Sequence, residues 1–269
     1  MLTHLLSSAQ NPKIKTIAKL KERRQRDETG QFLIEGYREL KRAAQSGVEI
    51  QMLLICPKLF LGENEETLIQ QIDKNKAEIF ECPPHLFEKL SYRDRPDGLI
   101  AIARQMQFSF DKLQSKKEPF VLIAEGIEKP GNLGSILRSA DASGADGVIV
   151  CDRCTDIYNP NVVRASVGTL FTLPVIEASS EETLLWLQKK QIKVTAATPS
   201  AHIEFTEANF KGPIAVVVGT EQLGLTDFWM KAADIRVRIP MKGAADSLNV
   251  AAATTLLLYE VLRQRNLSR

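Results

Sequence analysis

The chain has 269 residues with a formal net charge of +2; 44% of them are hydrophobic and 25% charged. This length supports one large domain or two modest ones with a sizeable core, and the composition excludes a disordered, collagen-like or disulfide-rich chain. No apolar run approaches the roughly 18 to 20 residues of a membrane helix. Asn11, Pro12 and Lys13 interrupt the stretch where a signal peptide would be apolar, so we expect a cytoplasmic protein without a membrane segment.

Alternating helix and strand patterns fill the first hundred residues. The apolar spacing predicts helices at 12–26, 38–44 and 65–74, and strands at 32–34, 50–55, 79–80 and 99–103. This order predicts a compact α/β domain over residues 1–105. Residues 106–118 have little sustained periodicity and are predicted to form a linker.

Residues 119–269 have a different texture and are predicted to form a second domain. Short, nearly continuous apolar runs lie at 120–124, 148–150, 172–176, 194–197, 214–218 and 235–239. Such runs are typical of strands buried on both faces, and helical patterns between several of them predict a mostly parallel, doubly wound sheet. The stretch 248–261 is apolar or small on nearly all sides. It therefore predicts a helix buried on nearly all sides, within the monomer or in a subunit interface.

Positive charge is concentrated near the N-terminus. Residues 1–46 contain ten basic and five acidic residues, a net charge of +5, whereas the remaining residues sum to −3. Contacts to phosphates supply affinity that does not depend on sequence, so this cluster indicates a polyanion partner. A solvated helix face would explain the same pattern. The candidate residues for this contact, which would bind RNA if the polyanion is a nucleic acid, are Lys21, Arg23, Arg24 and Arg26.

The cysteines and histidines do not form a metal-binding pattern. Cys151 and Cys154 make a single C-x-x-C without a second pair, and the three histidines are scattered. A structural zinc site needs four ligands, so we expect no metal. The cysteines are interpreted as buried or surface thiols, with redox chemistry as the alternative.

Polar residues follow the first strand of the second domain, in residues 125–138. They open a helix whose apolar stripe does not include Arg138, so this side chain can project toward the strand ends. Ligands bind at that edge of open α/β sheets, and a guanidinium suits a phosphate or carboxylate. Asn132 is a candidate both for a helix cap and for a substrate contact.

Two further strands run into glycine-bearing or small-residue loops. At 216–226 the pattern approaches the phosphate-binding loop G-x-x-x-x-G-K-[ST], but Leu225 takes the lysine position and argues against a nucleoside triphosphatase. The glycines there allow close approach of a ligand to the backbone, and Glu221 can accept from a donor or stiffen the loop. At 239–250 a strand ends before the last helix, where Ser247 and Asn249 are candidates for caps or substrate contacts.

Together these segments resemble a known family. Asn132 and Arg138 after a strand, G-x-E at 219–221, and I-P-M at 239–241 with S-L-N-V at 247–250 are similar to the three ordered motifs of the SpoU (TrmH-type) RNA ribose methyltransferases in the SPOUT superfamily. The resemblance covers residues 120–262. The first hundred residues, with T-G-Q-F-L-I-E-G at 29–36, resemble the substrate-binding domain that many members carry at the N-terminus.

The resemblance implies an α/β fold with a mostly parallel sheet, a C-terminal trefoil knot and a homodimer. It also implies S-adenosylmethionine as the cofactor. The residues that it places around this cofactor are Gly219, Ile239, Leu248, Thr198 and Met241. An apolar slot with a few amides and carbonyls at its edge suits adenine.

The resemblance further implies transfer of a methyl group to a ribose 2′-hydroxyl. Arg138 would be the catalytic group, either as a base or as a clamp on the neighbouring phosphate; the clamp is our preferred hypothesis because a guanidinium stays protonated. Asn132, Ser247 and Asn249 would position the ribose, and Glu221 would hold its loop. We expect ribosomal RNA as the substrate. Transfer RNA, a non-catalytic RNA-binding role and a different nucleotide-binding enzyme are the alternatives.

Overall fold

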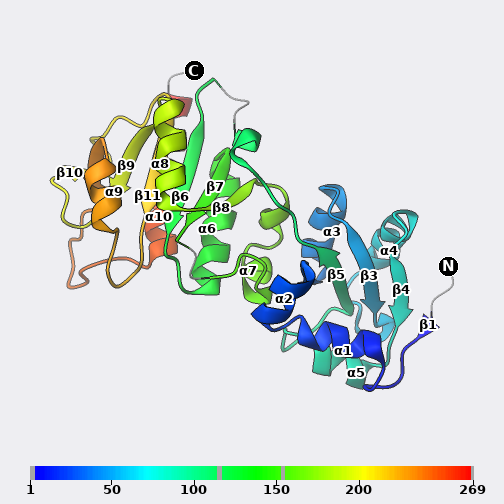
Figure 1. Cartoon of the computed structure of the whole chain (residues 1–269). Coiled ribbons are helices and arrows are strands. Elements are labelled where there is room, and N and C mark those ends of the chain that lie inside the picture. Colours follow the sequence, from blue (N-terminus) through cyan, green and yellow to red (C-terminus); the bar gives the residue numbers. More distant parts are fainter. Residues whose placement is uncertain (1–3, 114–116, 153–154, 268–269) are drawn as a thin grey trace. The chain divides into compact units, whose positions relative to one another are not determined.

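A computed structural model describes residues 4–113, 117–152 and 155–267. The chain divides into two compact units (Figure 1). The first contains the chain up to Met106 together with Asp156–Thr172, and the second contains Gln107–Thr155 and Leu173–Arg269. The predicted domain limits, 1–105 and 119–269, do not include this excursion of Asp156–Thr172 into the first unit.

The first unit is built on a five-stranded mixed sheet in the order β1-β4-β3-β5-β2. Strands β1, β4 and β3 are parallel, and β5 pairs antiparallel with both β3 and β2. The strands are β1 (His4–Leu5), β2 (Gln31–Glu35), β3 (Ile50–Ile55), β4 (Glu78–Glu81) and β5 (Leu99–Arg104). The helices are α1 (Pro12–Lys19), α2 (Arg23–Thr29), α3 (Tyr37–Gln45), α4 (Glu65–Lys74) and α5 (Pro84–Leu90). The predicted strands and the helices near 38–44 and 65–74 are confirmed.

The single helix predicted at 12–26 is wrong, because the chain breaks between α1 and α2. The side chain of Arg26 lies at this break. Its Nη1 donates to the carbonyl oxygens of Leu20 and Lys21, each at 2.8 Å. Those two carbonyls therefore turn toward the guanidinium and are not used in a continuous helix. The break lets α1 bury Ile14 and Ile17 against the sheet while α2 runs in its own direction.

The excursion Asp156–Thr172 packs closely on the first unit. It contains α7 (Pro160–Ala165) and the short helix η3 (Thr169–Phe171). Asp156 pairs with Arg26, and both side chains are almost completely buried. The ring of Tyr158 lies 4.6 Å from that of Phe32, centroid to centroid. A buried ion pair and an aromatic contact thus fix this segment to residues more than a hundred positions earlier.

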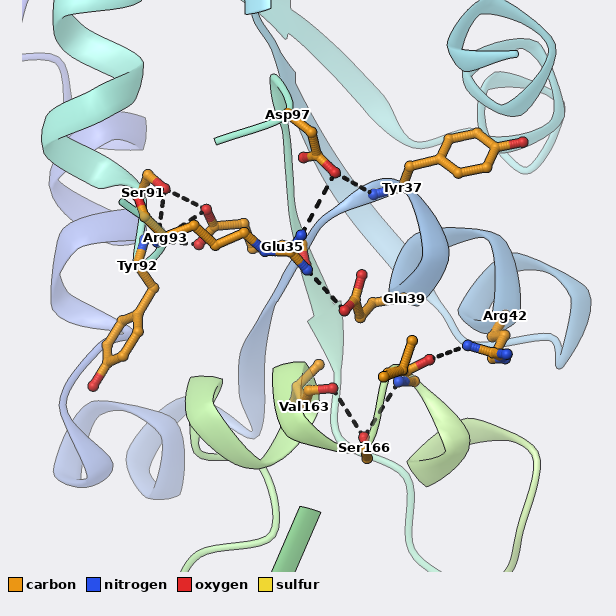
Figure 2. Close-up of polar contacts among 12 residues, drawn as sticks. Glu35, Tyr37, Glu39, Arg42, Ser91, Tyr92, Arg93, Asp97, Val163 and Ser166 are labelled. Atoms are coloured by element: carbon orange, nitrogen blue, oxygen red, sulfur yellow. Dashed lines mark hydrogen bonds and ion pairs between the residues drawn. The ribbon is translucent and has the colours of Figure 1, made fainter. Parts of the chain in front are cut away.

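A polar network fixes the loop before β5 to the start of α3 (Figure 2). The Glu35 carboxylate accepts from the backbone N–H of Tyr92 at 2.7 Å, and the guanidinium of Arg93 reaches Glu39 at 2.7 Å. The Asp97 carboxylate accepts from the first N–H of α3 at 2.8 Å. Burial raises the pKa of Glu39, and the charge of Arg93 opposes that shift. The network holds the loop in one shape above a buried carboxyl group.

The second unit is built on a seven-stranded, wholly parallel sheet in the order β10-β12-β9-β11-β6-β7-β8. The strands are β6 (Phe120–Glu125), β7 (Gly147–Cys151), β8 (Val175–Ala178), β9 (Lys193–Ala197), β10 (Ile203–Glu204), β11 (Ile214–Val218) and β12 (Ile235–Arg238). The helices are α6 (Pro130–Ser143), α8 (Ser180–Lys189), α9 (Asp227–Ala232) and α10 (Val250–Asn266). This confirms the predicted parallel α/β architecture.

Both faces of this sheet are covered. Side chains alternate along a strand, and Val121, Ile149 and Val217 join the two tryptophans of α8 and α9 in one core cluster. The alternate residues, such as Leu122 and Val216, are equally buried and face the opposite side. Helices α6 and α10 pack against each other and against β7 and β11 on that side. Continuous apolar runs in the sequence reflect this double coverage.

Three local predictions differ from the structure. The strand predicted at 172–176 starts at Val175, because Pro174 before it has no N–H to donate to a neighbouring strand. The last helix starts at Val250, after Asn249 as the capping residue, and not at 246–248. Part of the predicted linker is ordered, since Phe110–Leu113 forms the short helix η2 and Leu113 is buried in the core of the second unit.

Within the described ranges, no helix has both the length and the apolar character required to span a membrane.

Candidate active site

A cavity of about 550 Å³ lies in the second unit, where β9, β11 and β12 end. Ligands of open α/β sheets bind at the carboxyl ends of the strands, and the volume is in the range of small-molecule sites. The five residues predicted to surround the cofactor all line this cavity: Thr198, Gly219, Ile239, Met241 and Leu248. Segments separated by up to fifty positions in the sequence therefore meet around one space.

The loop after β11 folds back tightly on itself at the cavity wall. The backbone N–H of Thr220 donates to the carbonyl of Gly224 at 3.0 Å, and the N–H of Gly224 donates back at 3.1 Å. A Cβ atom on Gly219 would lie 2.3 Å from the Gly224 carbonyl oxygen, so no side chain fits there. Leu225 at its end packs against the core cluster that contains Trp229. The glycines are thus needed for the shape of the loop, as the sequence pattern indicates.

Glu221 is the centre of a hydrogen-bonded cluster that joins three segments. Its Oε1 accepts from the side-chain amide of Asn132 at 2.9 Å and from that of Asn249 at 2.6 Å. Its Oε2 pairs with the ammonium of Lys129. The pKa of Glu221 lies below its ordinary value, first because Lys129 donates to the carboxylate and then because Asn132 does. The loop carrying Glu221 is therefore tied to α6 and to the start of α10.

The cluster also settles which asparagine is a helix cap. Asn249 accepts from the backbone N–H groups of Ala251 and Ala252, so it caps α10 while its amide reaches Glu221. Asn132 lies in the first turn of α6, beyond the capping residue Lys129, and its amide points to Glu221. The cap interpretation is therefore right for Asn249 and wrong for Asn132.

Ser247 and Arg138 lie in different surroundings. Ser247 is exposed and lines the large cavity. Arg138 is exposed on α6 and lines neither the large cavity nor the small one of about 30 Å³ beside Asn132. The hydroxyl of its neighbour Ser139 hydrogen-bonds that of Thr255 on α10 at 2.7 Å. The turn of α6 that carries Arg138 therefore packs against α10, while Arg138 itself is exposed.

The predicted RNA-binding residues separate into exposed and buried groups. Arg23 and Arg24 are exposed on α2, where each pairs with a carboxylate one turn later. Lys21 is half-buried and donates to the carbonyl of Ser91 at 3.1 Å, and burial lowers its pKa. The RNA-binding prediction for Arg26 is wrong, because its side chain is 1% exposed and its charge is used by Asp156.

The metal and thiol predictions concern cysteines and histidines of both units. In the ranges that the structure describes, no three His, Cys, Asp or Glu side chains gather as a metal would require. Burial raises the pKa of the Cys151 thiol to about 12, which leaves it unreactive at neutral pH. Cys154 lies outside the described residues.

Two residues of the site were not predicted from the sequence. Lys129 contacts Glu221, although as a lysine in a turn it carries no distinguishing pattern. Glu125 ends β6 and is 3% exposed, and its carboxylate contacts Thr226 at the end of the loop beside the cavity. A charged residue at the end of an otherwise apolar strand was the available signal for Glu125.

Comparison with known proteins identifies relatives over most of the chain. Residues 119–259 match the SpoU rRNA Methylase family, and residues 11–101 match the MRM3-like substrate binding domain. The chain is 31% identical to a 23S rRNA (uridine(2479)-2′-O)-methyltransferase of Streptomyces viridochromogenes, over 92% of this chain and 88% of the relative.

Solved structures agree with these matches. A crystal structure of an RNA 2′-O ribose methyltransferase is 42% identical, with a TM-score of 0.85 over 97% of this chain and 99% of the other. An AdoMet-bound rRNA methyltransferase of Sinorhizobium meliloti is 28% identical, with a TM-score of 0.89 over 97% and 98%. The family match covers more than half of the chain and includes the cavity, the Glu221 cluster and Arg138. The chain belongs to the SpoU rRNA methylase family.

Proposed function

We propose that this protein transfers a methyl group from S-adenosylmethionine to a ribose 2′-hydroxyl of ribosomal RNA. The observation that carries the proposal is the meeting of Gly219, Ile239 and Leu248 around one cavity, beside the Glu221 cluster. The Streptomyces viridochromogenes relative is a 23S rRNA 2′-O-methyltransferase, and it aligns with 92% of this chain. The match of residues 119–259 to a family of rRNA methylases favours ribosomal RNA over transfer RNA.

The cavity fits the proposed cofactor. Its wall combines apolar side chains, among them Val218, Val237 and Ile239, with the bare backbone of Gly219 and the hydroxyl of Thr198. An adenine needs an apolar slot with backbone donors and acceptors at its edge, and these residues supply both. Bound S-adenosylmethionine would supply a methyl group on a positively charged sulfur.

The residues of the chain then have to position the ribose and provide for removal of the proton of its 2′-hydroxyl. Ser247 at the cavity and Asn132 and Asn249 in the Glu221 cluster have the donors and acceptors to hold a ribose. Arg138 grips the phosphate next to the ribose, that phosphate accepts the proton, and the guanidinium offsets the developing charge. Glu221 keeps the loop in position through its three partners.

We further propose that the active form is a homodimer. Arg138 lies outside the cavity of its own chain, and an apolar strip on α10 nearby is uncovered, with Leu256 43% and Tyr259 46% exposed. Pairing two copies through α6 and α10 would cover this strip. It would also place Arg138 of one copy at the cavity of the other.

A trefoil knot and a cytoplasmic location belong to the same proposal. The order β12-β9-β11 takes the chain from β11 past β9, and α10 then returns to α6. We place the knot in this return.

The proposed cytoplasmic location is supported by the cysteines. Buried free thiols at Cys56, Cys82 and Cys151 suit a reducing compartment.

The decisive experiment measures transfer of labelled methyl groups from S-adenosylmethionine to purified ribosomal RNA and transfer RNA. We expect label in ribosomal RNA, at a nucleotide that resists alkaline cleavage. Arg138→Lys is expected to reduce turnover at least tenfold, because lysine cannot form two parallel hydrogen bonds to a phosphate. Near-normal turnover would refute the clamp. Label in transfer RNA alone would refute the substrate, and cofactor binding without transfer to either RNA would indicate a non-catalytic protein.

A further inference from the structure

Both oxygens of the buried Glu125 carboxylate accept hydrogen bonds from one residue, Thr226. Glu125 is the last residue of β6, which lies beside β11, and it is 3% exposed. Its Oε2 accepts from the backbone N–H of Thr226 at 2.9 Å, and its Oε1 accepts from the Thr226 hydroxyl at 2.6 Å. Hydrogen bonds to an ionised group are among the stronger ones in proteins. This contact therefore fixes the position of Thr226 relative to the sheet.

Thr226 lies directly after the segment that lines the cavity. Residues 219–225 form one wall of the cavity, and β11 holds the start of this segment. Glu221 is tied to α6 and α10 in the middle of it. The pair of Glu125 and Thr226 holds its end. The wall is thus attached at three points, of which the last involves no residue that lines the cavity.

Thr226 makes this contact in place of its usual role. It is the capping residue at the start of α9, where a threonine side chain ordinarily accepts from a backbone N–H of the first turn. Here its side chain makes no such bond and its hydroxyl donates to Glu125 instead. Because this hydroxyl bonds the sheet and does not cap α9, we infer that its bond to Glu125 holds the end of the preceding loop.

We propose that Glu125, acting through Thr226, is a positioning residue for the cofactor-binding loop; this rests on the proposed assignment of the cavity to S-adenosylmethionine. Glu125 touches neither cofactor nor RNA. It raises the fraction of molecules in which residues 219–225 have the shape that binds. The apparent dissociation constant of a ligand is its intrinsic value divided by that fraction, so loosening the loop weakens cofactor binding without altering the chemical step.

Titration calorimetry with S-adenosylmethionine tests this on the full chain. Thr226→Val keeps the shape of the side chain and removes the hydroxyl, and we expect it to raise the dissociation constant about tenfold. Thr226→Ser restores the donor and is expected to stay within about twofold of wild type. In steady-state assays Thr226→Val should raise KM for S-adenosylmethionine and leave kcat unchanged when the cofactor is saturating. Thr226→Ala removes the same donor with less bulk and should behave as Thr226→Val does.

Thr183→Val is the control for the loss of a threonine hydroxyl elsewhere in the second unit. Thr183 is a buried threonine of α8 whose hydroxyl donates to the Ser179 carbonyl at 2.8 Å, away from the cavity. Its loss should lower the melting temperature and leave the dissociation constant unchanged. If Thr226→Val and Thr226→Ala bind the cofactor as wild type does, or if Thr183→Val weakens binding equally, the positioning role is overturned. If wild type itself does not bind S-adenosylmethionine, the proposed function fails instead.

Discussion

Arg26 and Arg24 lie two positions apart in α2 and are expected to differ sharply in what their loss costs. Both Nε and Nη2 of Arg26 approach Oδ2 of Asp156 to 2.7 Å, and the two side chains are 1% and 2% exposed. Arg26→Met keeps the length of the side chain but leaves the Asp156 carboxylate buried without its charge partner. Removing one member of such a pair costs about 3–5 kcal/mol. Since whole domains have only about 5–15 kcal/mol of stability, the first unit should be severely weakened.

Arg24→Met provides the comparison. Its side chain is 87% exposed and pairs with Glu28 one turn later, a contact of a kind that contributes about 0.3–0.5 kcal/mol. Urea unfolding followed by far-UV circular dichroism reports on both units, whereas tryptophan fluorescence reports on the second alone, because Trp186 and Trp229 both belong to it. Arg26→Met should shift the circular dichroism transition far more than the fluorescence one. Equal, small shifts for both variants would refute the argument that burial makes this pair essential.

Three further outcomes follow from the same structure. Burial raises the pKa of Glu39 against the opposing charge of Arg93, so the unfolded chain ionises first as pH rises above the ordinary value of 4.5. Wild type should therefore lose stability relative to Glu39→Gln as pH rises through the pKa of the folded state. The measurement is the difference in unfolding free energy between the two proteins, plotted against pH. A slope of the opposite sign would contradict the expectation. Leu256→Arg places a charge in the apolar strip of α10, and sedimentation should show monomers in place of dimers; an unchanged dimer would exclude this face as the interface. The double variant Arg23→Gln/Arg24→Gln should weaken RNA binding and reduce its salt dependence. Each lost phosphate contact should lower the steepness of log K against log salt concentration by about 0.7 to 0.9. An unchanged slope would show that α2 does not contact phosphates.

The general architecture could be predicted from the sequence because its signals are local. Apolar runs such as 120–124 and 214–218 are buried on both faces, and each lies in a strand of the parallel sheet. The break between α1 and α2 could not be found in this way. It depends on the guanidinium of Arg26 turning inward, and in a stretch rich in charge that arginine has the same local pattern as its solvated neighbours. Only its partner Asp156, 130 positions later, distinguishes it.

The candidate site shows the same division between motif and context. Gly219, Ile239 and Leu248 were grouped by a resemblance to a family, and the structure brings them around one cavity. Lys129 and Glu125 were not predicted as site residues, because Lys129 has no pattern of its own and Glu125 shows only a charge at the end of an apolar strand. Lys129 matters through Glu221 and Glu125 through Thr226, and both partners are about a hundred positions away. Residues that hold a site in shape are found only after the fold has placed their partners.

Glu221 explains why three weak motifs act together. Each of the segments around Asn132, Glu221 and Asn249 could be read by itself as an ordinary helix start or turn. One carboxylate oxygen of Glu221 accepts from both asparagines. The position of each segment therefore depends on the positions of the other two. Lys129 donates to this carboxylate and lowers its pKa further below the ordinary value, so the ionised cluster accepts hydrogen bonds throughout the neutral pH range. The site is therefore assembled by an anion that lies beside the cavity, and a change at any of the three segments should disturb the same loop.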